Sequence, residues 1–157
     1  MADVATNRGA RLFQELKFRG QWLDRNGAVR AKPTTFYYAL CTASPAPTKD
    51  TNLLSELTQV SGGGYTSGGY AIPANAAGFP SIVEDDTLDK SVATIIDVIV
   101  QASGGAIPAF GWVALTDDAA VVSDRQVLGA FEVNPAVSIA DGTVKVLQGG
   151  KLEDAPA

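Results

Sequence analysis

Short β-favouring segments, separated by turns that contain proline and glycine, fill the chain after Pro33. The segment "TTFYYALCTA" (34–43) is dense in aromatic and β-favouring residues and is predicted to be a strand. "SVATIIDVIVQA" (91–102) alternates most regularly, and its β-branched residues disfavour a helix. Further strands are predicted in "AFGWVALTD", "QVLGAFEV" and "TVKVLQ". Because the strands are short and no later helix interrupts them, the sequence predicts a mainly β fold, an antiparallel β-sandwich or barrel of jelly-roll type.

A helix is predicted before these strands, in "NRGARLFQELKFRGQWL" (7–23). Thr6 or Asn7 would cap its first turn by accepting a hydrogen bond from a backbone N–H. An apolar stripe at near-helical spacing is formed by Leu12, Leu16 and Leu23, with Phe13 and Trp22 beside them. The expected organisation is an N-terminal helical arm (1–32), a β-sandwich or barrel domain (33–150) and a flexible C-terminal tail (151–157).

Charge is divided unevenly along the chain. Residues 1–32 hold seven Lys and Arg against three Asp and Glu, a net charge of +4, whereas the remaining residues hold five against fourteen, a net charge of −9. The basic arm is interpreted either as a contact surface for a negatively charged partner or as a solvated amphipathic helix. The acidic body would repel phosphate, so nucleic acid is not an expected partner. A membrane is not expected either, because no apolar run reaches the roughly 20 residues that span a bilayer.

The glycine-rich stretch "QVSGGGYTSGGYAIP" (59–73) raises the question of a phosphate-binding loop. Such a loop needs glycines that lead into a helix, with a Lys-Ser or Lys-Thr pair to hold phosphate and magnesium. No lysine occurs between Asp50 and Asp89, and "YAIP" cannot begin a helix. The stretch is therefore predicted to be a bend or bulge at the edge of a sheet, whose glycines adopt conformations that a Cβ forbids.

Few residues of the sequence are suited to catalysis. Histidine, the commonest general base and transition-metal ligand, is absent. Cys41 therefore has no histidine partner, and it is predicted to be a small hydrophobic core residue. The acidic clusters Glu84–Asp86 and Asp117–Asp118 lack the alternating spacing of a calcium loop, so they are predicted to lie in turns and on the solvated surface. No cofactor or metal is expected, and a hydrolase with paired carboxylates is the alternative enzymatic interpretation.

Six stretches follow one another along the chain: a helix ending near Trp22–Leu23, then "KPTTFYYALCTASPAPT", "ELTQVSGGGYTSGGYAI", "FGWVALTDDAA", "VLGAFEV" and "NPAVSIADGTVKVLQGGKLE". In this order they resemble a group of small structural proteins of tailed bacteriophages. Members of that group are described as tail-fibre or minor structural proteins, and similar small β-proteins serve as capsid cement. The resemblance covers most of the chain from Pro33 to Leu152, although "TQV" (58–60) stands where the group usually has a glutamate-valine pair.

The resemblance implies a non-enzymatic virion structural protein that is made in the host cytoplasm and carried in the virion. The implied role is a capsid decoration or cement protein, which binds the outer surface of the head and stabilises the shell. Its implied partners are the major capsid protein and further copies of itself in a homotrimer, without nucleic acid, membrane or cofactor. The arm would face the shell, since aromatic and Arg side chains are favoured at interfaces. The candidate contact residues are Arg8, Arg11, Phe13, Phe18, Arg19 and Trp22.

A tail, neck or fibre-attachment protein is the alternative within the virion. In that role Tyr65, Tyr70, Trp112 and Asp117–Asp118 would form a carbohydrate-binding surface, provided that the aromatic rings are exposed. Trp112 lies in a predicted strand, so burial of its ring is the competing prediction. The aromatic residues of the arm have the same alternative, above all Trp22, which is also predicted to pack under the sheet.

Overall fold

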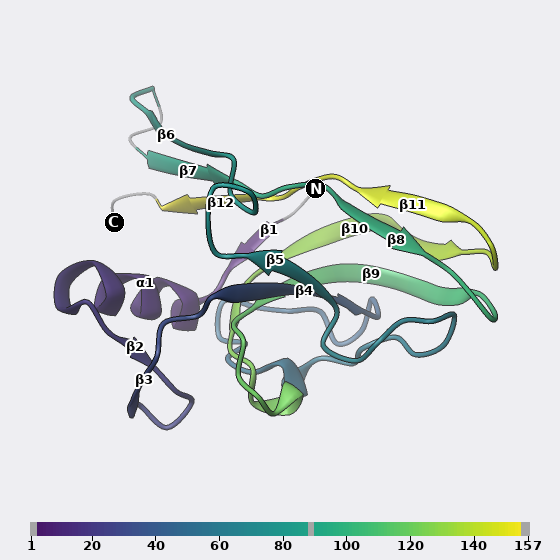
Figure 1. The fold of residues 1–157 in the computed structure, drawn as a ribbon, viewed down its shortest axis with the longest axis horizontal. Helices are drawn as coiled ribbons and strands as arrows, with labels where there is room; N and C mark the ends of the chain where they lie inside the picture. Colours follow the sequence, from purple (N-terminus) through teal and green to yellow (C-terminus); the bar gives the residue numbers. More distant parts are fainter. Residues whose placement is uncertain (1–2, 88–89, 155–157) are drawn as a thin grey trace.

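A five-stranded antiparallel sheet forms the centre of the computed structural model, which describes residues 3–87 and 90–154. Its strands lie in the order β1-β10-β9-β4-β5 (Figure 1). They are β1 (Asp3–Ala5), β4 (Thr35–Cys41), β5 (Tyr70–Pro73), β9 (Ile107–Thr116) and β10 (Val127–Ile139). The strands predicted within 34–43, 109–117 and 126–133 are thereby confirmed.

Side chains of β4 alternate between the two faces of this sheet. Tyr38 and Leu40 are buried in the main core on one face, and Ala39 and Cys41 are buried in a smaller core on the other. Because both faces are covered, the strand is apolar on both sides instead of alternating apolar and polar. The prediction that Cys41 is a core residue is confirmed, and burial raises the pKa of its thiol to about 12.

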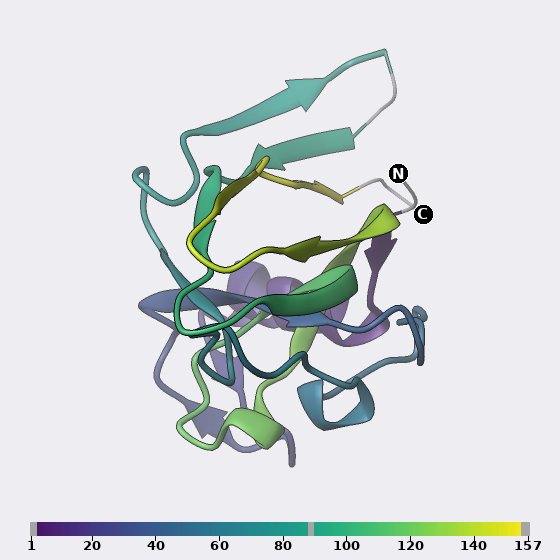
Figure 2. The same cartoon turned by 90° about the vertical axis from the view of Figure 1, so that its right-hand side faces the viewer.

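Two smaller antiparallel sheets lie over one face of the main sheet (Figures 1 and 2). One pairs β8 (Val98–Gln101) with β11 (Val144–Leu147), which confirms the strand predicted in 143–148. The other has the order β12-β7-β6 and consists of β6 (Ser81–Asp85), β7 (Lys90–Thr94) and β12 (Lys151–Asp154). The protein is therefore mainly β, with several antiparallel sheets and one N-terminal helix, and the sheets of the described ranges do not close into a barrel.

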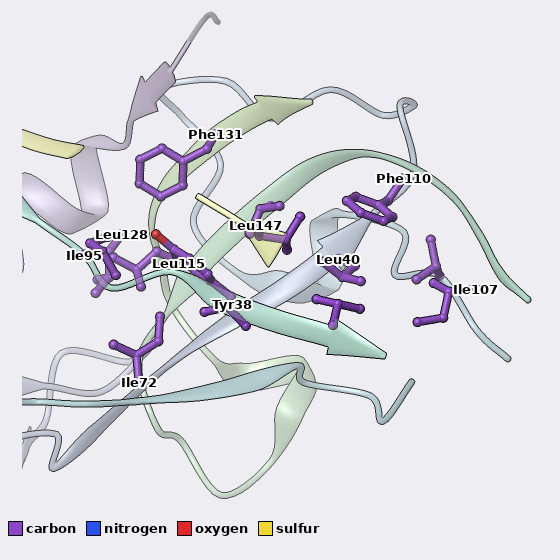
Figure 3. Close-up of a cluster of buried hydrophobic side chains, with 14 of the residues drawn as sticks. Tyr38, Leu40, Ile72, Ile95, Ile107, Phe110, Leu115, Leu128, Phe131 and Leu147 are labelled. Atoms are coloured by element: carbon purple, nitrogen blue, oxygen red, sulfur yellow. The ribbon is translucent and has the colours of Figure 1, made fainter. Parts of the chain in front are cut away.

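The main core lies between these layers. Figure 3 shows side chains from the main sheet, among them Leu40 and Leu115, pointing toward Leu147 of the second layer. The ring of Tyr38 meets that of Phe131 edge to face, with 5.7 Å between centroids. The Tyr38 hydroxyl accepts a hydrogen bond from the backbone N–H of Gly150 at 3.1 Å, and burial raises the pKa of this phenol. The buried Tyr38 hydroxyl therefore has its hydrogen-bond partner within the protein.

The segment 91–102 is two strands, so the prediction of one continuous strand is wrong. β7 ends at Thr94 and β8 begins at Val98, and the chain changes sheets between them. The break is held by hydrogen bonds to a neighbouring turn: Ile95 N donates to Gly150 O at 3.0 Å, and Gly149 N donates to the Asp97 carboxylate at 2.7 Å. The polar Asp97 within the apolar run marks the position of the break.

Helix α1 (Asn7–Arg19) is shorter than predicted. Thr6 is its N-cap, and Gly20 ends it in the left-handed conformation at φ 66°. The chain then forms a small hairpin of β2 (Trp22–Leu23) with β3 (Val29–Arg30). Leu12 and Trp22 belong to the same buried core as the main sheet, so the described residues of the predicted arm are continuous with the β-domain.

Lys151–Asp154 form a strand, so the prediction of a flexible tail is wrong for these residues. β12 pairs with β7, which places Leu152 opposite Ala93. Leu152 also packs against the main core. This contact could not be predicted from the sequence, because the neighbours of Leu152 are polar. Residues 155–157, the rest of the predicted tail, lie outside the described ranges.

Two 3₁₀ turns complete the fold, η1 (Leu54–Glu56) and η2 (Val122–Asp124). The first precedes the glycine-rich stretch, and its Leu54 is buried in the smaller core. In the part of the chain that the structure describes, no helix is long and apolar enough to cross a membrane.

Candidate protein-binding surface

Helix α1 is fixed firmly to the end of the main sheet. Thr6, its N-cap, accepts a hydrogen bond from Gly9 N at 3.0 Å and donates one through Oγ1 to Val127 O at 2.5 Å. Gly9 lies so close to β10 that a Cβ at this position would be 2.3 Å from Leu128 O. Leu12 is fully buried one turn further on. The helix therefore presents its outer side to solvent in a defined orientation.

The outer side of α1 carries an aromatic ring among cations. Arg11 and Phe18 are two helical turns apart on the same side, opposite the buried Gly9. Phe18 is 76% exposed, and the ammonium nitrogen of Lys17 lies 5.4 Å from the centre of its ring. We call this set the α1 surface: Arg8, Arg11, Lys17, Phe18 and Arg19.

Two cations of the α1 surface have no partner within the described ranges. Arg8 and Arg11 form neither an ion pair nor a hydrogen bond there through their side chains. Arg19, in contrast, lies 3.3 Å from the Glu15 carboxylate, which also accepts a hydrogen bond from Gln21. The free positive charge of the surface is therefore concentrated at Arg8 and Arg11, with Lys17 beside the aromatic ring.

Two of the six predicted contact residues are not part of this surface. Trp22 is fully buried, and its indole N–H donates to the Asp117 carboxylate at 3.2 Å, so its prediction as a contact residue is wrong and its alternative as a core residue is confirmed. Phe13 is 37% exposed and packs edge-on against Trp22, with 6.1 Å between ring centroids. Trp22 lies in β2, after the end of the helix, and its ring also packs edge-on against Phe36, with 6.2 Å between ring centroids.

A buried carboxylate joins this hairpin to the end of β9, and the sequence did not predict it. Asp117 is fully buried, whereas an acidic pair was expected in a turn on the surface. Its oxygens accept hydrogen bonds from the backbone and side-chain N–H groups of Gln126, both at 2.9 Å, and Arg30 lies 3.9 Å away. Arg30 also pairs with Asp118. These contacts fix the β2–β3 hairpin beside α1, because Trp22 of β2 is one of the donors.

The alternative carbohydrate-binding surface is not assembled. Trp112 is only 8% exposed and packs in the smaller core, and Asp117 is buried. Tyr65 is half-buried, and its hydroxyl donates to Gln59 and accepts from the backbone N–H of Leu40, both at 3.0 Å. Burial raises the pKa of this phenol. The prediction of an aromatic sugar platform from these residues is therefore wrong.

The glycine-rich stretch is a set of tight bends against the protein itself, as predicted. Gly62, Gly63, Gly64, Gly68 and Gly69 all have positive φ. A Cβ on Gly63 would lie 2.5 Å from Ile107 N, and one on Gly69 would lie 1.8 Å from Tyr38 O. Only glycine permits these close approaches, which let the loop pack along β4 and β9.

The α1 surface contains no acidic or cysteine side chain that could bind a metal ion. Across residues 3–87 and 90–154, no three Asp, Glu or Cys side chains are placed to share a metal ion. Comparison of the chain with models of protein families, with curated proteins and with solved structures found no match.

Proposed function

We propose that the protein is a non-enzymatic structural protein of a tailed-bacteriophage virion, which decorates the outer surface of the head and stabilises the shell. In this role it is made in the host cytoplasm and binds the major capsid protein and further copies of itself, without cofactor, nucleic acid or membrane. The resemblance of the sequence to small phage structural proteins supports the virion assignment. The observation that carries the proposal is the α1 surface, a rigidly held helix that exposes Phe18 among unpaired cations.

The α1 surface has the composition of a protein contact. Phenylalanine and arginine are enriched at the centres of protein interfaces, whereas lysine is depleted there. Covering an exposed Phe side chain contributes roughly 1.5–3 kcal/mol, so Phe18 alone could anchor a weak contact. Several copies on a regular lattice would multiply such a contact by avidity.

A decoration protein stabilises a shell without any chemical step. A protein that binds the assembled shell but not its separated subunits stabilises the assembled state by mass action, and the effect grows with its concentration relative to the Kd. A homotrimer would match the local three-fold symmetry of a capsid lattice, and this is the oligomer that we propose.

Binding of the full-length protein to purified expanded heads that lack it tests the proposal. Co-sedimentation should be saturable, and Phe18→Ala should weaken it by about tenfold. Val121→Ala is the matched control, because Val121 is also an exposed apolar side chain but is the N-cap residue of η2 and not part of the α1 surface. Absence of binding to heads would overturn the decoration role. Binding to tails or necks instead would establish the alternative position in the virion.

A further inference from the structure

The edge strand β6 carries a second exposed surface of opposite character to the α1 surface. β6 is the last strand of its sheet and pairs only with β7 among the described strands. Figures 1 and 2 show the β6–β7 pair projecting outward from the rest of the protein. Ile82 is 72% exposed there, the highest exposure of any large aliphatic side chain in the described ranges. An exposed apolar edge strand favours pairing or packing with another protein.

An acidic side chain shares the face of Ile82. Because side chains alternate along a strand, Ile82 and Glu84 project to the same side of β6, and Asp86 follows in the turn after the strand. Glu84 and Asp86 are exposed and have no hydrogen bond or ion pair through their side chains within the described ranges. We call these three residues the β6 surface. It combines one large apolar side chain with two free negative charges.

We propose that the α1 surface of one copy binds the β6 surface of a second copy. This inference rests on the proposed function: the neighbouring copy is the partner of the α1 surface, and loss of this contact weakens binding to heads through loss of avidity. Each surface places a large apolar side chain beside unpaired charges, and the charges are opposite in sign. Phe18 would cover Ile82, and Arg11 would approach Glu84 and Asp86.

The spacing of the residues on the two elements agrees with this pairing. Arg11 and Phe18 are separated by about 10 Å along the helix axis, at 1.5 Å per residue. Ile82 and Glu84 are separated by about 7 Å along the strand, at 3.3 Å per residue, and Asp86 follows just beyond the end of the strand. A helix laid along the strand with Phe18 on Ile82 therefore brings Arg11 about 3 Å past Glu84, within reach of an arginine side chain.

Charge also selects the arrangement of the copies. Contact between two α1 surfaces would bring cations together, and contact between two β6 surfaces would bring carboxylates together. Only the head-to-tail arrangement joins opposite charges, and it leaves one free surface of each kind at the ends of an open assembly. Such a heterologous contact forms a ring where its rotation closes, which is the arrangement that a homotrimer requires.

Charge reversal tests the contact, with solution mass measured by light scattering over a range of concentrations. Arg11→Glu and Glu84→Arg should each raise the concentration needed for association by about tenfold or more. The double variant R11E/E84R restores opposite charges and should associate as the unaltered protein does. An equimolar mixture of the two single variants should form mixed pairs but no complete trimer, because a ring of three always contains one contact between two copies of the same variant. Asp141→Arg, an exposed change in the 140–143 turn, is the control for charge reversal alone.

The outcomes separate this inference from the proposed function. Association that both single variants retain, or a monomer at all concentrations, overturns the α1–β6 contact even if the protein binds heads. Association that the single variants lose and the double variant regains supports the contact even if heads are not bound. Thermal unfolding of each variant should stay unchanged, because both surfaces are exposed, and this excludes misfolding as the cause of a loss.

Discussion

Gly69 shows, at the scale of one residue, how closely the glycine-rich stretch approaches the sheet. Its φ is +86°, and a Cβ would lie 1.8 Å from Tyr38 O. Gly69→Ala should therefore lower the free energy of unfolding by more than about 3 kcal/mol, since both the conformation and the contact are incompatible with a side chain. Urea denaturation measures the change.

Gly142 is the matched control for this substitution. Its φ is +72°, but a Cβ there would have nothing within 4 Å. Gly142→Ala should thus cost only the roughly 1–2 kcal/mol of the left-handed conformation. Equal losses in the two variants would show that the close approach of Gly69 to Tyr38 is not what limits this position.

Cys41 should make the free energy of unfolding fall as pH rises in the alkaline range. Burial raises its pKa to about 12, whereas a free thiol titrates near about 8.5. Because the folded-state pKa is the higher one, the stabilisation is complete below the unfolded-state pKa and is lost as pH rises toward the folded-state pKa. Between pH of about 8 and 9.5, unfolding free energy should fall by about 1 kcal/mol more in the natural protein than in Cys41→Ala. Parallel pH profiles for the two proteins would contradict this assignment.

The burial of a residue was predictable where it depends only on the strand that contains the residue. Cys41 was predicted as a core residue because it lies in a predicted strand and has no histidine partner, and it is buried because both faces of this central strand are covered. Trp22 and Asp117 could not be placed in this way. Their mutual hydrogen bond joins residues that are far apart in sequence, and an acidic pair after a strand normally indicates a solvated turn.

At the scale of elements, the two sides of α1 should respond differently to substitution. Leu12→Ala should destabilise the protein by about 2–5 kcal/mol, because Leu12 is fully buried. Phe18→Ala should change stability by no more than about 0.5 kcal/mol, because its ring is exposed. Thermal or urea unfolding compares them. A large loss in Phe18→Ala would mean that this ring is part of the core, and the α1 surface would then lose its central residue.

Element boundaries were predictable only where local signals fix them. The strands β4, β9 and β10 follow from dense β-favouring residues, and Thr6 caps α1 as expected. The break after β7 and the strand β12 depend on contacts with each other: Ile95 bonds to Gly150, and β12 pairs with β7. Sequence periodicity does not contain such distant pairing, so 91–102 resembles one strand and 151–154 resembles a tail.

At the scale of the whole molecule, the separation of charge should make self-association sensitive to salt. The basic α1 surface and the acidic β6 surface lie on different elements, and both are exposed. Raising NaCl from about 0.1 M to about 1 M shortens the Debye length from about 10 Å to about 3 Å, so association should weaken by at least about tenfold. Light scattering at the two salt concentrations measures this. Stronger association at high salt would indicate a contact made mainly by apolar side chains.

The α1 surface was predictable in part from the separation of charge along the chain. The uneven charge along the chain drew attention to α1, and Phe18 is exposed, as a contact residue must be. The β6 surface was not predicted, since Glu84–Asp86 was interpreted as solvated turn residues. The β6 surface is a candidate contact because Ile82 is exposed at the edge of a sheet. This exposure arises from the tertiary fold and not from local sequence.

The position of the protein in purified phage particles tests the central claim most directly. Under the proposed function a phage encodes the chain; heads and tails of its particles would be separated, and peptides of this protein and of the major capsid protein would be quantified by mass spectrometry in each fraction. The decoration role predicts that the protein is found with the heads, in a constant ratio to the major capsid protein. Its presence in tails alone, or in infected cells but not in particles, would contradict that role.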